Sequence, residues 1–547
     1  MKCKFFGLGN LFIKDGVEDK PLPEGPVEFE DAIAATKFGK FNIMLVGFAC
    51  LSAHAFIFDT TVPPYIIPSA ECDLQISLLD KGILNGISHA GMICSAPIVG
   101  YLADTIGRQK ILFWGLLVDA ICNISATFSH SFMLSLFLKF IAGFFVGGTN
   151  TVVISMIAEF HSARIRPSLV MLTGLWFTLA MLVVPLMALL FLVNPFNTTF
   201  GENYEFHSWQ IFWGVMSIPA TLGAILAFFI PESPRFLISR NRTAEALIVL
   251  RKVYSINTGL PPDTYPVKEL KLIHNPEKDT KTLEESRPKG EVVMDGVIEE
   301  VGGVREESTW EAVKGGLRQL RPLLRPPHLP NVLIMFMVHF GGVMGCNSLR
   351  LWLPQLFKMM SDYEAAGGDG SLCDMISFGN QTIAQKPWPE DGTCEPIHVK
   401  PDTYINSVIV ASVQVALCAV ASIFINTIGK RRLLVTTLFC GGVCTISLYW
   451  CTSTVQATAL ASITVAFTAI CMQAVLSIAV DLFPTALRAM AVSLIMMLGR
   501  IGSITGSIGF PALLAAGCLT PFLTLGLILI GGGLIALFIP APTKHAT

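Results

Sequence analysis

The sequence predicts an all-α membrane protein in which twelve transmembrane helices form two parallel six-helix bundles. Composition is the first observation behind this prediction. Of 547 residues, 52% are hydrophobic and only 14% are charged, whereas soluble domains carry about 25% charged residues. The second is a set of apolar runs long enough to cross a bilayer, which takes about 20 residues. The third is an internal repeat that divides these runs into two sets of six.

The apolar runs define the predicted spans. The first run, residues 41–61, holds only two ionisable residues, His54 and Asp59. Backbone groups in lipid must be satisfied within their own segment, so each run is expected to be helical. The first six runs cover residues 41–61, 82–102, 111–128, 132–157, 169–192 and 209–230, and the second six cover 331–357, 403–427, 433–452, 457–480, 490–513 and 518–540.

Two short sequences occur twice with one spacing. "DTIGRQK" at 104–110 returns as "NTIGKRR" at 426–432, and "EFHSARIR" at 159–166 is matched by "DLFPTALR" at 481–488, 322 residues apart in both pairs. A repeat of half the chain indicates a duplicated bundle, since solenoid repeats have periods of 20–50 residues. Both sequences fall in loops on one side of the predicted membrane.

We expect the repeated loops to act in gating. Asp104 can hold Arg108 and face the positive N-terminal end of a neighbouring helix, an interaction worth about 0.3–1 kcal/mol when exposed. Such ties are expected to stabilise an outward-facing state and to break when the protein opens inward. The alternative is that the turns only retain positive charge on the cytosolic side. The predicted gating residues are Gly100, Asp104, Gly107, Arg108, Glu159, Arg166, Asn426, Gly429, Arg431, Asp481 and Arg488.

The distribution of basic residues predicts the orientation. The loops that carry the repeats are rich in Lys and Arg, whereas the opposite short loops, 63–80, 129–131, 193–208 and 453–456, contain none. Because positive loops stay in the cytosol, both termini are expected there. The chain is therefore predicted to be a multi-pass protein of the plasma membrane or a vesicle membrane.

The same pattern gives the domain boundaries. We expect a cytosolic tail at 1–39, bundles at 40–230 and 331–540, a cytosolic linker at 231–330 with short helices and a disordered stretch, and a cytosolic tail at 541–547. The segment 358–402 is expected to form a loop on the extracellular or lumenal side. Membrane lipid is the expected surrounding, and the protein is expected to be a monomer. The net charge of −2 gives no case for a nucleic-acid partner.

Residues on the outer side suggest covalent modification. Cys373 and Cys394 are a candidate disulfide in an oxidising compartment, with Cys72 as an alternative partner. Asn197 and Asn380 begin glycosylation sequons. The fourteen cysteines include no CxxC pair and no His/Cys cluster with zinc-ligand spacing. No metal or cofactor is therefore expected.

"GYLADTIGRQK" at 100–110 resembles the signature loop of the major facilitator superfamily. "PESPRFL", "AEFHSARIR" and "DLFPTALR" resemble the branch that holds sugar porters, organic-ion transporters and synaptic vesicle glycoprotein 2. "IPSAECD", "DKGIL" and "FHSWQIFW" are closest to the synaptic vesicle glycoprotein 2-like proteins. The resemblance implies the major facilitator fold.

The resemblance has two departures. The acidic first-span pattern of the synaptic vesicle glycoprotein 2-like proteins, Ala-Asp-Gly-Val-Glu, becomes "AFIFD" at 55–59, with Phe56 in place of the Asp and Asp59 in place of the Glu. The long outer loop of synaptic vesicle glycoprotein 2 is short here, at 358–402. A neurotoxin-receptor or vesicle-specific role is therefore not inferred.

Ionisable residues inside spans are the candidates for a substrate site, because each costs about 2.5–3.5 kcal/mol at a helix centre. The resemblance implies that the first and seventh spans line the cavity. Asp59 and Arg350 could pair there as an outer gate, hold a charged ligand, or simply reach water. Arg500 lies where the resemblance to organic-anion transporters implies a ligand contact, but it could also pair with Asp119 or extend to the membrane surface.

Other polar residues in spans complete the prediction. Lys139 could be a cavity charge or a partner for Asp119. The three mid-span histidines, His54, His89 and His339, could relay protons or be hydrogen-bonded within the core. The predicted cavity residues are Asp59, Asp119, Lys139, Trp176, Arg350, Gln414, Gln473 and Arg500.

The preferred function is secondary active transport of a small organic solute, an organic ion or a sugar-like molecule, by rocking of the two bundles. Proton and sodium coupling both stay open. The alternative is a transporter-like membrane protein that acts mainly in binding or trafficking. No nucleophile elbow, metal cluster or phosphate-binding loop indicates an enzyme.

Overall fold

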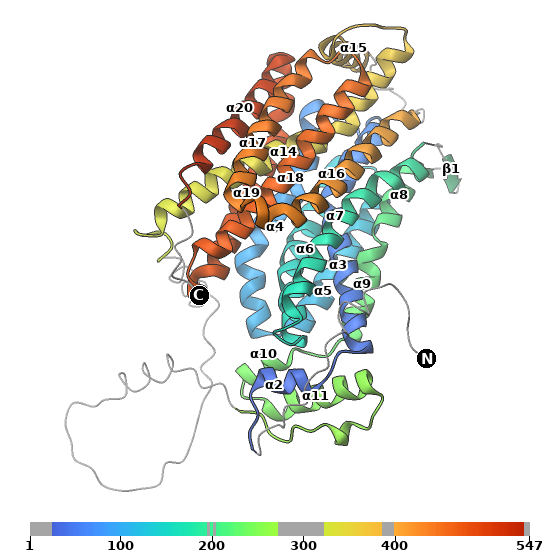
Figure 1. Ribbon diagram of the computed structural model, residues 1–547. Coiled ribbons are helices and arrows are strands. Elements are labelled where there is room, and N and C mark those ends of the chain that lie inside the picture. The colour runs from blue at the N-terminus through green and yellow to red at the C-terminus, as the bar shows by residue number, and fades with distance from the viewer. Residues whose placement is uncertain (1–24, 194–196, 201–203, 272–321, 386–398, 541–547) are drawn as a thin grey trace, which may run out of the picture.

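A computed structural model of the chain describes residues 25–193, 197–200, 204–271, 322–385 and 399–540. Two groups of long helices make up most of it (Figure 1). The first group, here called the N-half, contains α3 (Lys40–Ala70), α4 (Leu78–Thr105), α5 (Arg108–Thr127), α6 (Phe132–Phe160), α7 (Arg166–Phe191), α8 (Ser208–Met216) and α9 (Ile218–Phe229). The second, the C-half, contains α14 (Leu329–Ala365), α16 (Pro401–Ile428), α17 (Lys430–Ser447), η2 (Leu448–Trp450), α18 (Thr454–Leu482), α19 (Thr485–Ala516) and α20 (Leu519–Ala536).

The helix lengths confirm the predicted spans. Within the described part of the chain, eleven helical segments are long and apolar enough to cross a membrane, and one of them joins α8 and α9 across Ser217. The bent helix α4 makes twelve when its two arms are counted as one span. The break between α8 and α9 precedes Pro219, which lacks the backbone N–H that a continuous helix would use. The predicted all-α architecture of six plus six spans is therefore confirmed.

The repeated turns have the same local structure. Gly107 is the N-cap of α5 with φ of 110°, and Gly429 is the N-cap of α17 with φ of 90°. Only glycine adopts this region without strain. The end of the molecule that carries both turns is called the basic end below, and the opposite end, where α15 lies, is called the disulfide end.

In the described part of the chain, the two halves share hydrophobic cores only at the disulfide end. There, Val399 and Tyr404 pack into the N-half core around Trp209 and Trp213, and Leu78 packs against the C-half core around Trp352. At the basic end, the core around Phe41 and Phe160 holds no C-half residue. The core around Leu434 and Phe483 holds no N-half residue. Of the described residues, the halves are thus joined at one end and separate at the other.

A small helical subdomain covers the basic end of the N-half. It consists of α2 (Phe29–Ala35), α10 (Pro234–Ser239), α11 (Thr243–Thr258) and η1 (Pro262–Thr264), as Figure 1 shows. Val27 pairs with Leu270, and the Tyr265 hydroxyl donates to the Ala32 carbonyl at 2.6 Å. Burial raises the pKa of Tyr265. Residues 25–39, expected to belong to a cytosolic tail, therefore include a helix, because the apolar residues of α2 pack on the linker helices.

The disulfide end is more ordered than the predicted loop 358–402. α14 continues to Ala365, and α15 (Leu372–Gln385) follows it. A hairpin of β1 (Asn197–Phe200) and β2 (Tyr204–His207) stands in the predicted loop 193–208. Asn197 and Asn380 lie at this end in β1 and α15, although their side chains are outside the described ones. Their glycosylation stays a prediction.

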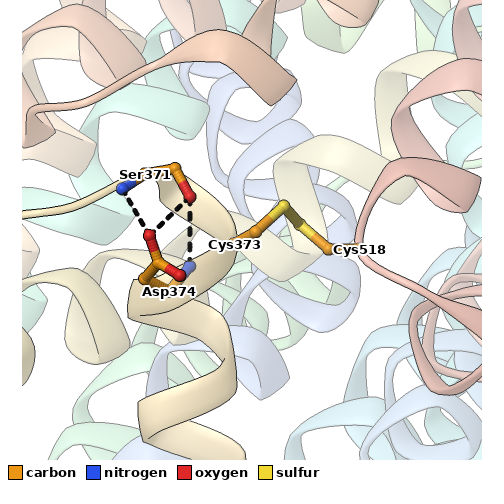
Figure 2. The surroundings of a disulfide bond; sticks show 4 residues. All are labelled: Ser371, Cys373, Asp374 and Cys518. Carbon is orange, nitrogen blue, oxygen red and sulfur yellow. Dashed lines mark hydrogen bonds between the residues drawn. A yellow bond between two sulfur atoms is a disulfide. The ribbon is translucent and has the colours of Figure 1, made fainter.

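The cysteine pairing differs from the prediction. Cys373 of α15 forms a disulfide with Cys518, which precedes α20 (Figure 2). The Cys373–Cys394 pair is therefore wrong, since Cys518 approaches only through the packing of the C-half. Cys394 lies outside the described residues, and Cys72 is itself disulfide-bonded. Beside the bridge, Ser371 donates to the Asp374 carboxylate at 2.8 Å from both its N–H and its hydroxyl, which lowers the pKa of Asp374.

Candidate functional site

A group of charged side chains is buried inside the N-half. The Lys139 ammonium on α6 donates to Asp59 Oδ1 on α3 at 2.5 Å and to Asn123 Oδ1 on α5 at 3.0 Å. The Asn123 amide in turn donates to Asp119 Oδ1 at 2.9 Å. Lys139 and Asp119 are 1% exposed and Asp59 is 2% exposed. These four residues, called the N-half ion cluster below, bring three helices together.

Trp213 closes one side of the N-half ion cluster. Its indole N–H donates to Asn123 Oδ1 at 3.1 Å, and its ring lies 5.5 Å from the Lys139 nitrogen. A cavity of ≈ 10 Å³ adjoins the cluster, room for about one water molecule. Oδ2 of Asp59 and Oδ2 of Asp119 have no hydrogen-bond partner in the described structure. The cluster therefore keeps two acceptor atoms for a proton or a water.

A second cavity lies between the halves. It has a volume of ≈ 20 Å³ and is lined by residues of α3, α7, α14, α16 and α18. Arg350 of α14 borders it and donates to Thr61 Oγ1 at 3.2 Å and to Asn347 Oδ1 at 2.9 Å. The Nε of Arg350 is buried without a partner. Gln414 of α16 also lines the cavity and lies 3.3 Å from the Met181 sulfur.

Arg500 crosses between the halves nearer the middle of the helices. It extends from α19 and donates to the Met92 carbonyl of α4 at 3.0 Å. Its guanidinium carbon lies 6.0 Å from the centre of the Phe56 ring. His89, one turn before Met92 on α4, is 7% exposed, and neither of its ring nitrogens has a partner.

The structure corrects three predicted pairings. Asp59 pairs with Lys139 and not with Arg350, because Asp59 points into the N-half and not into the interface between the halves. Arg500 does not meet Asp119, whose Oδ1 accepts from Asn123. Lys139 is sealed among α3, α5 and α6, so it is not a cavity charge, and Asn123 stands between it and Asp119.

The remaining predicted residues are scattered. Trp176 on α7 has an unpaired indole N–H, and Gln473 on α18 is exposed. His54 bonds the Cys50 carbonyl at 2.8 Å, as expected of a core histidine. His339 is 5% exposed, and its Nδ1 has no partner.

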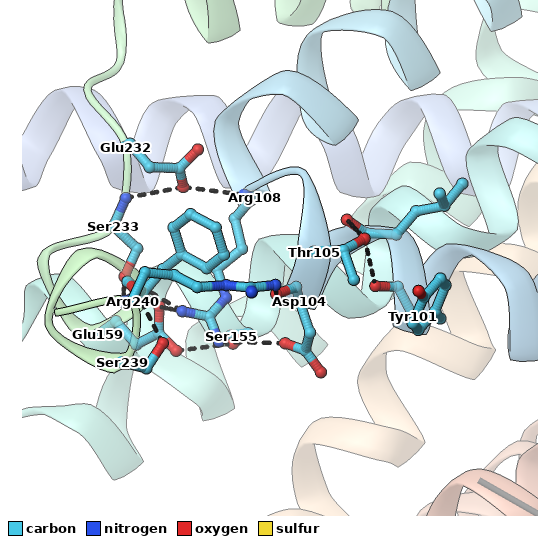
Figure 3. A network of polar contacts seen from close by, with 12 residues as sticks. Tyr101, Asp104, Thr105, Arg108, Ser155, Glu159, Glu232, Ser233, Ser239 and Arg240 are labelled. Atoms are coloured by element: carbon cyan, nitrogen blue, oxygen red, sulfur yellow. Dashed lines mark hydrogen bonds and ion pairs between the residues drawn. The ribbon is translucent and has the colours of Figure 1, made fainter. Parts of the chain in front are cut away.

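The turn after α4 is the centre of a polar network (Figure 3). Arg108 donates to Glu159 Oε2 at 2.7 Å and lies 3.6 Å from Asp104, whose side chain is 77% exposed. Ser233 also donates to Glu159 Oε2, at 2.5 Å. Glu232 accepts from the N–H groups of Arg108 at 2.9 Å and of Gln109 at 3.3 Å, which satisfies two of the free donors at the start of α5.

The C-half repeats the ion pair in a reduced form. Lys430 donates to Asp481 at 2.6 Å, and these residues stand 322 positions after Arg108 and Glu159. Arg431 bonds the Leu537 carbonyl. Arg166 donates to Glu30 at 3.0 Å, whereas Arg488 has an unpaired Nε. Gly100 lies within α4 and is not part of the turn. Asn426 lies in α16, and the structure does not describe its side chain.

All the described contacts of these turns join elements of one half or its subdomain. They are present in a structure whose halves are apart at the basic end. Arg108–Glu159 and Lys430–Asp481 each lie within one half, so parting of the halves at the basic end would leave both pairs intact.

Cross-half contacts gather at the disulfide end. Lys358 of α14 donates to the Pro68 carbonyl at 3.3 Å and lies 4.0 Å from Glu71, which pairs with Lys81 at 2.7 Å. The rings of Tyr65 and Tyr404 stack at 6.4 Å. Among the described residues, hydrogen bonds between the halves extend from the disulfide end toward the basic end, and the last of them joins Arg500 to Met92.

Sequence reasoning missed several functional candidates. Asn123 follows Asp119 by four residues, so the helical spacing could have revealed it. Lys430 could have been found from the 322-residue offset that matches Glu159 to Asp481. Thr61 and Tyr65 carry no such signal, because only folding places them beside Arg350. Among the described residues, no group of three His, Cys, Asp or Glu side chains could hold a metal ion.

Comparison with known proteins gives one family. Residues 32–360 and 394–547 match the family described as "Sugar (and other) transporter". Synaptic vesicle glycoprotein 2B of Rattus norvegicus is 27% identical over 343 residues, which cover 62% of this chain and 48% of that protein. Synaptic vesicle glycoprotein 2A of Rattus norvegicus is 25% identical over 344 residues, or 62% of this chain and 45% of that protein. The chain thus matches about half the length of these curated relatives.

Solved structures give the fold. The inward open conformation of the xylose transporter XylE from E. coli has a TM-score of 0.61 at 16% identity, covering 93% of this chain and 98% of that one. A partially occluded inward open conformation of XylE has a TM-score of 0.60 at 15% identity, with 92% and 100% covered. Both support the predicted major facilitator fold of a multi-pass membrane protein.

Proposed function

Because the chain belongs to the sugar (and other) transporter family, we propose that it is a secondary active transporter that moves a small organic solute by alternating access. The observation that carries this proposal is the uneven joining of the halves. They share cores at the disulfide end and have separate cores at the basic end. A solute could reach the interface from the basic end, whereas tilting of the halves would close that end and open the other.

The basic end would face the cytosol. Its turns hold Arg108, Lys110, Lys430, Arg431 and Arg432, and positive loops remain on the cytosolic side. The disulfide Cys373–Cys518 at the opposite end agrees with this orientation, because disulfides persist in oxidising compartments. The conformation described is then open toward the cytosol.

The cavity beside Arg350 would hold the solute. It is bordered by both halves, so a bound solute would contact α3 and α7 on one side and α14, α16 and α18 on the other. Thr61, Tyr65, Ser407 and Gln414 supply hydroxyl and amide groups for orientation. The cavity is small because the two halves are in contact at the disulfide end. It would widen when the halves separate there.

The N-half ion cluster would couple transport to a proton. The cluster holds two carboxyl groups and one ammonium, of which Asp59 pairs with Lys139 and Asp119 accepts from Asn123, so with both carboxyl groups ionised one negative charge is in excess in a buried site. Binding of one proton by either carboxyl group would remove that excess charge. Asp59 lies on α3 two residues before Thr61, which bonds Arg350, so a change of charge could be transmitted to the interface.

Flux in vesicles tests the proposal. Purified protein would be reconstituted and supplied with labelled D-xylose, salicylate or tetraethylammonium, each with and without an inward proton gradient. We expect flux of at least one solute above protein-free vesicles, stimulated by the gradient, and loss of that stimulation in Asp59→Asn. The control is Asp263→Asn, which also removes a carboxylate but from an exposed position outside the spans.

The alternative role in binding or trafficking gives the opposite result. Such a protein would show no flux of the three solutes, and cysteine pairs placed across the basic end would crosslink to the same extent in every condition. This outcome would overturn the transport proposal, since alternating access requires the basic end to close.

A further inference from the structure

We propose that Lys358 closes a gate at the disulfide end, and that three short segments of the N-half build the other side of this gate. The segments are "IPSAECD" at 67–73, "DKGIL" at 80–84 and "FHSWQIFW" at 206–213. They are separated in the sequence, yet the structure brings their polar side chains together at one end of the molecule. The inference rests on the proposed function and names the residues that hold the disulfide end shut.

The N-half side of the gate is fixed by contacts within the N-half. Glu71 Oε1 accepts from the Lys81 ammonium at 2.7 Å, and the two residues are 6% and 1% exposed. Two positions later, Asp73 Oδ2 accepts from the Trp209 indole N–H at 2.6 Å and lies 2.7 Å from His207 Nδ1. The loop between α3 and α4 is therefore held at two points, and Lys81 is a positioning residue for the Glu71 carboxylate.

The C-half reaches this loop from two helices. The Lys358 ammonium on α14 donates to the Pro68 carbonyl at 3.3 Å and lies 4.0 Å from Glu71 Oε2. The hydroxyl groups of Tyr404 on α16 and Ser69 on α3 are 3.5 Å apart. Within four residues, the chain thus offers a carbonyl, a hydroxyl and a carboxylate to the other half.

The arrangement allows the Lys358 contact to break at low cost. A buried carboxylate that loses its only cation is strongly destabilised. Glu71 avoids this penalty, because Lys81 belongs to the same half and stays with it when Lys358 withdraws. The Lys358 side chain is 14% exposed, so its ammonium lies near water and becomes hydrated when the halves part. The gate therefore opens without leaving an unpaired charge inside the N-half.

The test measures how often the basic end closes, since that end closes when the disulfide end opens. Ala96→Cys on α4 and Met496→Cys on α19 place one thiol in each half, at exposed positions. Each lies four residues beyond the Arg500–Met92 contact toward the basic end, on helices that run in opposite directions. The free cysteines that are not buried, Cys50, Cys94, Cys440 and Cys444, are first replaced by serine.

The purified protein is oxidised in detergent with copper phenanthroline. Capping with N-ethylmaleimide and intact mass then count the remaining thiols, which gives the rate of crosslinking. Lys358→Met should raise this rate about tenfold, because it removes a hydrogen bond from a charged donor across the closed end. The variant should fold, since Glu71 retains Lys81. Lys358→Arg keeps a cationic donor and should stay within about twofold of the parent.

Lys400→Met is the matched control. Lys400 is also a lysine of the C-half at the disulfide end, but it donates to the Ser361 carbonyl at 2.9 Å and lies 4.0 Å from Asp362, both within the C-half. Its replacement should leave the rate of crosslinking unchanged. Loosening confined to the disulfide end would not change this rate either, because both thiols lie toward the basic end.

An unchanged rate in Lys358→Met, or an equal rise in Lys400→Met, would overturn the assignment of the gate. The transport proposal would then stand, because crosslinking in the parent would still show that the basic end closes. Absence of crosslinking in the parent and in every variant would instead contradict alternating access, and the gate would fall with it.

Discussion

The two halves of the molecule repeat each other in sequence, yet they pair their charges differently. In the N-half, Lys139 and Arg108 meet Asp59 and Glu159 within the same half, at 2.5 and 2.7 Å. In the C-half, Arg350 and Arg500 have only neutral partners, and each reaches into the other half. The repeat explains the turns but not these charges. The positions equivalent to Asp119, Lys139 and Arg500, 322 residues away in the other half, hold the uncharged residues Gly441, Ala461 and Thr178.

This difference in pairing distinguishes two kinds of charge. One kind stabilises its own half, and the other is available to bind a ligand. A paired buried ion depends on its partner, so removing one member leaves an uncompensated charge. An arginine with neutral partners leaves no such charge behind when it is replaced. Stability measurements can therefore distinguish the two kinds of site.

The largest expected effect is on the N-half ion cluster. Lys139→Met leaves Asp59 and Asp119 buried without a cation, which should lower stability by about 3–5 kcal/mol. The measurement is the midpoint of thermal unfolding of the purified protein in detergent. Arg350→Gln is the matched control and should change stability by less than about 1 kcal/mol. Equal losses in the two variants would contradict the comparison.

The next effect compares the repeated ion pairs. Arg108→Ala leaves Glu159, which is 5% exposed, with two serine hydroxyls, and should cost about 1–3 kcal/mol. Lys430→Ala removes the equivalent cation from a pair whose side chains are 30% and 42% exposed, and should cost less than about 1 kcal/mol. Thermal unfolding of both variants measures the difference. A larger loss of stability in the Lys430 variant would show that burial does not determine how much each ion pair contributes to stability.

The smallest effect at neutral pH concerns His161, whose place in the C-half is taken by Phe483. Burial lowers the pKa of His161 to about 4, against about 6.5 in the unfolded chain. The unfolded state therefore binds a proton first as pH falls, and folded stability should decline between pH 6.5 and 4. His161→Phe should flatten this decline and change little at pH 7.5. An unchanged pH profile in the variant would assign the decline to other groups.

Much of the fold could be predicted because the signals are local. Hydropathy located the spans, and the spacing of "DTIGRQK" and "NTIGKRR" located the two turns, whose glycines have matching positive φ. The segments outside the spans were less accurate. α2 and α15 lie in segments that were expected as a cytosolic tail and a loop, because short helices that pack on other elements carry little signal of their own.

The candidate site was predicted by residue type but not by partner. Asp59, Asp119, Lys139, Arg350 and Arg500 were singled out because each is ionisable within an apolar run. The Asp59–Arg350 pair, one of the alternatives considered for these two residues, does not form because Asp59 faces α6 inside the N-half. The expected Cys373–Cys394 disulfide failed for a similar reason, since α15 packs beside the start of α20.

The sequence by itself determined the twelve spans, the duplicated half and the small set of charges that lie in the membrane. These follow from runs of neighbouring residues, because the cost of placing backbone and charge in lipid is met segment by segment. Only the tertiary structure decided which charges neutralise each other and which remain at the interface between the halves. Ion pairing depends on a few ångströms between residues such as Asp59 and Lys139, 80 positions apart, and that distance is set by helix packing.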